Sequence, residues 1–71
     1  MKYIIVDNKD GDLFTTEFNT AEEAIKEADK QFNYLTEHDK KHRQAFYVLE
    51  SVNPDEDADN HFDGNPIKEY I

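Results

Sequence analysis

Residues 38–42 (HDKKH) contain the two histidines whose type and spacing come nearest to a catalytic metal site. In a helix they lie on one face, four residues apart, and an acid follows the first, as in the His-Glu-x-x-His motif of zinc hydrolases. The two lysines between them and Arg43 beside them oppose the binding of a dication, and aspartate is one methylene shorter than the glutamate of that motif. The third ligand would have to be His61. These residues therefore favour a solvated basic turn over a zinc centre.

Residues 55–63 (DEDADNHFD) are a second candidate metal site, because aspartates recur within a short span. The first three aspartates match the first three ligand positions of an EF-hand calcium loop. The sixth position is Asn60 instead of glycine, and the twelfth is Pro66 instead of glutamate, so no EF-hand is predicted. The main prediction is a solvated acidic loop with no metal and no cofactor. Weak, calcium-like cation binding is the alternative, and its ligands would be Asp55, Asp57, Asp59 and Asp63.

Catalysis has little support in the sequence. The chain has no cysteine and only two glycines, so it offers neither a thiolate metal site nor a glycine-rich phosphate loop. Acids are abundant, but no pattern places two of them in an apolar pocket that would shift a pKa. We predict a protein that is not an enzyme and has no catalytic residues.

The strongest compositional feature is the formal net charge of −9. Binding to the phosphates of nucleic acid requires a basic surface, and an anionic membrane repels an acidic one. Neither nucleic acid nor a membrane is therefore predicted as a partner, and a basic protein or a cation is favoured. A further alternative is that the acids mimic nucleic acid and so inhibit a basic protein. The acidic run over residues 50–63, together with the helix surface, motivates that alternative.

One small domain must position these residues, because 71 residues support a single core. Residues 20–36 are predicted to form its helix, which Thr20 and Glu23 begin as a capping box. The polar run that follows is expected as a further helical turn or a loop. The apolar stripe of the helix has helical spacing and consists of Ala21, Ala24, Ile25, Ala28, Phe32 and Leu35.

The remaining elements are predicted to be strands and one loop. Residues 2–18 should form a hairpin, because an Asp-Gly pair is a strong turn signal between two β-prone runs. Residues 44–52 should form a third strand, rich in aromatic and branched side chains. Residues 53–66, with a proline near each end, are predicted to be an acidic surface loop. The tail, residues 67–71, alternates weakly and is expected as a short edge strand.

The connections predict an α+β fold in which one helix covers one face of a mainly antiparallel sheet. A right-handed crossover from the hairpin to the third strand places that strand beside the first, which gives the order 2-1-3. The face under the helix is predicted to carry Ile4, Val6, Phe14, Phe18, Phe46 and Val48. The opposite face would then be too apolar for water and offers a candidate interface made of Tyr3, Ile5, Leu13, Tyr47 and Leu49. This opposite face could be covered in three ways: by the tail through Phe62, Ile67 and Tyr70, by a second copy of the chain in a homodimer, or by a different protein.

The end of the helix and the next strand carry a recognisable pattern, an aromatic-x-x-Leu-Thr-x-x-acid-basic-basic turn over residues 32–41 followed by the strand at 45–49. This pattern resembles an uncharacterised family of small bacterial proteins whose members occur on mobile genetic elements. The resemblance covers most of the chain. It implies a hairpin and helix leading into the turn and strand, and it implies no catalytic residue.

These observations predict a small, acidic, non-catalytic protein-binding or regulatory module. The apolar run at residues 3–6 is too short for a signal peptide, so a cytoplasmic location is expected.

Overall fold

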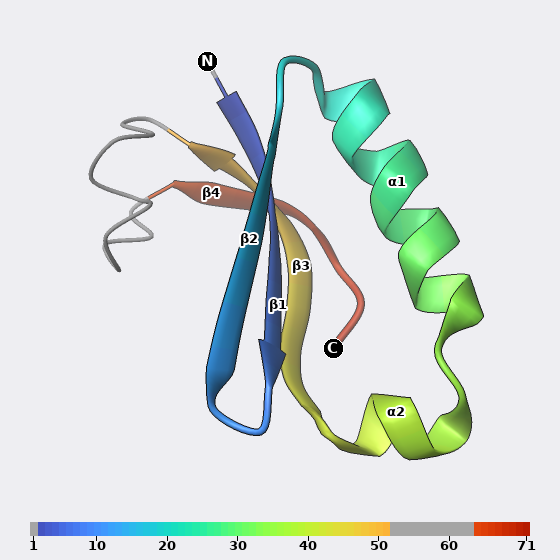
Figure 1. The fold of residues 1–71 in the computed structure, drawn as a ribbon. Helices are drawn as coiled ribbons and strands as arrows, with labels where there is room; N and C mark the ends of the chain where they lie inside the picture. The colour runs from blue at the N-terminus through green and yellow to red at the C-terminus, as the bar shows by residue number, and fades with distance from the viewer. Residues whose placement is uncertain (1, 52–63) are drawn as a thin grey trace.

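Four antiparallel strands form one sheet, and a helix lies across one of its faces (Figure 1). The structure, a computed structural model, describes residues 2–51 and 64–71. The strand order is β2-β1-β3-β4. The predicted α+β fold is therefore confirmed, including the order 2-1-3 and the C-terminal edge strand. The elements are β1 (Lys2–Lys9), β2 (Asp12–Phe18), α1 (Ala21–Tyr34), α2 (Glu37–Lys41), β3 (Arg43–Ser51) and β4 (Asn65–Glu69).

The hairpin of β1 and β2 closes through a turn of two residues. Lys9 pairs with Asp12, and the intervening Asp10 and Gly11 have φ angles of 51° and 91°. A turn with left-handed backbone at both central positions matches the right-handed twist of the flanking strands. Glycine adopts this conformation without steric cost, and aspartate is one of the few other residues that tolerate it.

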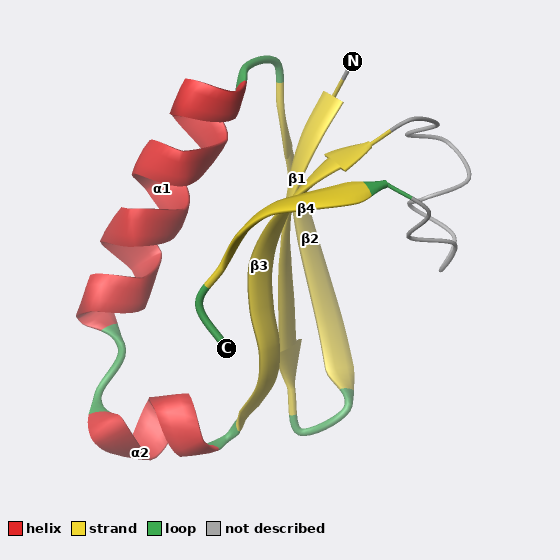
Figure 2. Ribbon diagram, turned by 180° about the vertical axis from the view of Figure 1, so that it is seen from behind, coloured by secondary structure: helices red, strands yellow, loops and turns green. Residues whose placement is uncertain are grey.

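Two helices replace the single helix expected over residues 20–36. The Oγ1 of Thr20 accepts a hydrogen bond from the amide of Glu23 at 3.2 Å, which caps α1. α1 ends at Tyr34, because Leu35 has extended backbone. The reciprocal capping box is at Thr36 and begins α2, so the polar run after α1 is a helical turn. Both helices lie on the same side of the sheet (Figure 2).

The core between α1 and the sheet is built from small residues on the helix and large ones on the strands. Ala24 and Ala28 have no exposed surface, and they pack against Ile5, Phe46 and Val48. Because alanine side chains are short, the helix axis can approach the sheet closely. A second buried cluster lies on the other face of the sheet and consists of Ile4, Val6 and Leu49, with Tyr47 packed against it.

The predicted faces of β1 are wrong. Residues directly opposite each other in an antiparallel pair point to the same side, and Tyr3 lies opposite Phe18 while Ile5 lies opposite Val48. Tyr3 and Ile5 therefore face α1, whereas Ile4 and Val6 point away from it. The residues at 3–6 are apolar at every position, so this strand has no alternation that fixes its parity. The predicted faces of Phe18 and of the β3 residues are correct.

The C-terminal tail packs on the helix side of the sheet. The amides of Tyr70 and Ile71 donate to the carbonyl oxygen of Phe46 at 2.8 and 3.2 Å. The centroid of the Tyr70 ring lies 5.1 Å from the centroid of the Phe32 ring and 5.4 Å from that of the Phe46 ring. The prediction that Tyr70 covers the opposite face of the sheet is therefore wrong. Phe62, which was predicted to help cover that face, lies outside the described residues.

Candidate functional site

The five residues predicted as one interface do not share a face. Tyr3 and Ile5 lie against α1, while Leu13, Tyr47 and Leu49 are on the other side of the sheet. Ile5 and Leu49 are also almost fully buried, with 2% and 1% of their surface exposed. Of the five, Leu13 is the one that is clearly exposed, at 39%. The five residues therefore do not form a single surface.

The exposed apolar residues that are close together instead lie on β2. Leu13 and its neighbour Phe14, which is 58% exposed, point to opposite sides of this strand. β2 is an edge strand that pairs with β1 alone among the described elements. Its outer backbone N–H and C=O groups are therefore available to another strand. The predicted order 2-1-3 already places this strand at an edge of the sheet, but Leu13 and Phe14 were assigned only to its two faces, and no binding role was predicted for the edge itself.

The two edges of the sheet differ in how they are protected. β4 is short, contains Pro66 and Lys68, and pairs with β3 through a register shift. Proline, lysine, short length and bulges are the features that discourage further strands from joining an edge. β2 is longer, lacks proline and lysine, and pairs with β1 in continuous register. β2 is therefore the open edge of the sheet.

A groove of about 450 Å³ lies between α1 and the β2 side of the sheet. Phe18 supplies its apolar wall from the end of β2, and the helix supplies charged side chains at helical spacing. On the other flank of α1, Asp29 contacts Lys68 at the β4 edge. The groove is thus on the side of the helix that faces the open edge. The helix residues that line it are Glu23, Lys26, Glu27 and Lys30.

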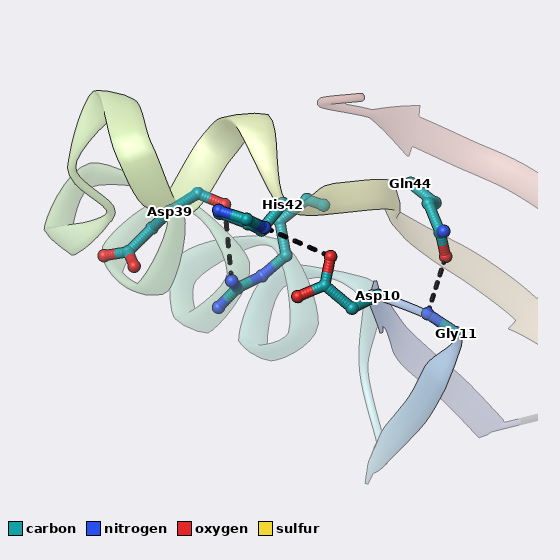
Figure 3. A network of polar contacts seen from close by, with 6 residues as sticks. Asp10, Gly11, Asp39, His42 and Gln44 are labelled. Carbon is teal, nitrogen blue, oxygen red and sulfur yellow. Dashed lines mark hydrogen bonds and ion pairs between the residues drawn. The ribbon is translucent and has the colours of Figure 1, made fainter.

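The two histidines singled out in the sequence meet, but they belong to a structural contact. Their rings lie 4.4 Å apart at α2, and His42 Nδ1 is 3.1 Å from the Oδ1 of Asp10. The Asp10 amide also donates to the His42 carbonyl at 3.1 Å. Figure 3 shows the contact between the His42 ring and the Asp10 carboxylate, and beside it the hydrogen bond that the Gly11 amide donates to the Gln44 side chain at 2.8 Å. In residues 2–51 and 64–71, no group of three or more His, Cys, Asp or Glu is arranged to hold a metal ion. These bonds fasten the hairpin turn to the start of β3.

A polar cluster fixes the C-terminal tail to α1. The Oδ1 of Asp29 accepts a hydrogen bond from Lys68 at 2.8 Å and another from the hydroxyl of Tyr70. These two hydrogen bonds lower the pKa of Asp29, and the bond from Lys68 has the larger effect. Burial, and then the contact with Asp29, raises the pKa of Tyr70. The cluster joins an ionised carboxylate to a neutral phenol, which is an arrangement that stabilises the fold.

The candidate cation ligands Asp55, Asp57, Asp59 and Asp63 lie outside the described residues. The same is true of most of the acidic run on which the nucleic-acid-mimic alternative depends. Both alternatives stay predictions.

No family model matches the chain, and no curated protein or solved structure is significantly similar to it. The resemblance to an uncharacterised bacterial family stays a prediction. Neither α1 nor α2, the helices of the described chain, is long and apolar enough to cross a membrane.

Proposed function

We propose that this protein is a small acidic module that binds another protein and performs no catalysis itself. The observation that carries the proposal is the open edge of β2, where Phe14 is largely exposed on the same side of the sheet as Phe18, the residue of β2 that lines the groove. Exposed aromatic residues are enriched at the centres of protein interfaces, because they bury a large area at little entropic cost. An exposed aromatic residue on an open edge strand is therefore the best-supported binding feature of the described surface.

Charge indicates what kind of partner this surface would bind. The whole chain has a net charge of −9, and β2 contributes Asp12 and Glu17 with no basic residue. A basic partner is attracted over a distance of about 10 Å at 0.1 M salt, and that attraction weakens as salt increases. We therefore propose a basic protein partner.

The test compares what three forms of the immobilised protein capture from an extract of the cell that makes it. The wild type is compared with Phe14→Ser and with Ile67→Ser, whose apolar side chain is also exposed, at 38%, but lies on β4 at the opposite edge of the sheet. We expect one protein to be captured by the wild type and by Ile67→Ser, to be lost with Phe14→Ser, and to be released by salt. Capture that is insensitive to Phe14→Ser, or no salt-sensitive capture at all, contradicts the proposal.

A further inference from the structure

We infer that the open edge binds an extended segment of a partner in which apolar and basic residues alternate, and that this segment joins the sheet as a fifth strand beside β2. The inference rests on the proposed function and specifies how the partner is recognised. Strand addition of this kind obtains affinity from backbone hydrogen bonds and specificity from alternate side chains.

The position of the groove supports a strand as the bound element. An added strand would lie about 4.8 Å outside β2, on the flank of α1 that Glu23, Lys26, Glu27 and Lys30 form. It would pair with the unprotected edge and lie beside the helix. A strand at the β4 edge would instead meet Pro66 and Lys68. The fold therefore offers one favourable edge.

The alternation along β2 indicates which side chains the partner would need. Phe14, Thr16 and Phe18 point to the helix side of the sheet, because they lie opposite Asp7, Ile5 and Tyr3 of β1. Asp12 begins the same row beside the turn, where it lies opposite Lys9. Side chains of an added strand on that side would contact the two phenylalanines and enter the groove, so apolar residues fit there.

The other side of β2 has a different character. It carries Leu13, Thr15 and Glu17, which lie opposite Asn8, Val6 and Ile4. A basic residue on this side of the added strand would lie near the carboxylate of Glu17. The two sides together select a segment that alternates apolar and basic residues.

A second copy of the chain fits this edge poorly. Each copy has a net charge of −9, and two β2 strands would bring the acids Asp12 and Glu17 of both copies together without a base from either strand. Like charges that approach in this way are destabilising. The occupant is therefore a basic segment of another protein.

The binding test uses three synthetic heptapeptides and the full chain. In the first, lysine and valine alternate; in the second, four lysines precede three valines; in the third, glutamate replaces each lysine of the first. We expect the alternating lysine peptide to bind roughly tenfold or more tightly than the block peptide, which has the same composition. The glutamate peptide should not bind. Equal binding of the two lysine peptides would show simple charge attraction and overturn the inference, as would no binding of the alternating peptide.

Two N-methylated forms of the alternating peptide test strand addition directly. One carries N-methyl groups on its odd residues and the other on its even residues, so each lacks the amide donors of one edge while both keep every side chain. A peptide strand directs one of these edges at β2 and the other at solvent. We expect one form to bind like the parent peptide and the other to lose binding. Equal binding of the two forms, whether retained or lost, would overturn the inference.

Variants of the protein complete the test. Phe14→Ser should weaken binding of the alternating peptide roughly tenfold, as expected for an interface anchor, and Ile67→Ser, at the β4 edge, should leave it unchanged. Binding that is equal for both variants would contradict the role of β2. Light scattering should show a monomer, whereas a dimer that Phe14→Ser dissociates would make a second copy the occupant and overturn the inference.

The two proposals fail in different ways. Phe14-dependent capture of a protein, combined with equal binding of the two N-methylated peptides, would keep the proposed function and reject strand addition. Failure of both capture and peptide binding would reject the proposed function as well.

Discussion

At the scale of single residues, Gly11 shows how backbone conformation constrains the choice of side chain. Its φ angle of 91° lies in the left-handed region, and a Cβ atom placed there would meet nothing within 4 Å. Any cost of replacement therefore comes from the backbone and not from crowding. We expect Gly11→Ala to lower the free energy of unfolding by about 1–2 kcal/mol, measured by urea denaturation. Gly11→Asn should cost less, because asparagine tolerates this conformation. Equal costs for the two variants would contradict this explanation.

The phenol of Tyr70 should make stability depend on pH in the alkaline range. Its pKa is raised in the folded protein, by burial first and then by the contact with Asp29, so folding favours the neutral phenol. This contribution to stability is complete below about pH 10, the ordinary pKa of tyrosine, and is lost as the pH rises above it. We expect Tyr70→Phe to flatten the fall in urea stability between about pH 10 and 12.

Tyr34→Phe is the matched control for Tyr70→Phe, because Tyr34 is exposed, and it should follow the wild-type curve. Burial also raises the pKa of Tyr47, so part of the alkaline loss should remain in Tyr70→Phe. A Tyr70→Phe curve as steep as that of the wild type would contradict the role of this phenol.

At the scale of elements, the packing of α1 depends on the two alanines that face the sheet. Ala28 has no exposed surface and lies over Ile5, Phe46 and Val48. A larger side chain would have to push the helix away from the strands. We expect Ala28→Leu to lower the free energy of unfolding by about 1–3 kcal/mol, measured by urea denaturation. Asn33→Leu, at an exposed position of the same helix, should change it by less than about 0.5 kcal/mol. Equal effects would mean that the helix does not pack closely.

The elements that the sequence predicted well are those with local signals. The Asp-Gly pair determines a hairpin turn by itself, and the apolar stripe of residues 20–35 indicates a helix without reference to the rest of the chain. Short connections and crossover handedness then leave few strand orders.

What sequence reasoning missed depends on contacts between distant residues. The face of Ile5 was assigned wrongly because its neighbours Ile4 and Val6 are equally apolar. Asp10 and His42, which fasten the turn to β3, are 32 positions apart, and no local pattern links them. The groove between Phe18 and α1 likewise exists only once the helix has crossed the sheet. The binding surface was therefore harder to predict than the fold.

At the scale of the whole molecule, the excess of acids sets how stability responds to salt. The chain has a net charge of −9, and repulsion among its charges disfavours the compact state. Salt at about 0.5 M shortens the range of that repulsion to a few ångströms. The surface ion pairs that salt also weakens contribute little. We expect this screening to raise the free energy of unfolding by about 0.5–1 kcal/mol, which corresponds to a rise of roughly 2–8 °C in the midpoint of thermal unfolding.

Thermal unfolding in sodium chloride at pH 7 measures this effect. At pH 4.5, the isoelectric point given by the composition, the dependence on salt should be much weaker. A midpoint that falls with salt at pH 7 would show that attractive ion pairs outweigh the repulsion.

The unequal edges of the sheet have a consequence for self-assembly. A fibril grows by strand addition only if every new molecule presents a further free edge to the next one. Here β2 can accept a strand, whereas β4, with Pro66, Lys68 and its register shift, does not offer a second growing end. Edge pairing between folded molecules would therefore terminate after one step. The protein can keep one reactive strand exposed at high concentration without acting as a seed for polymerisation.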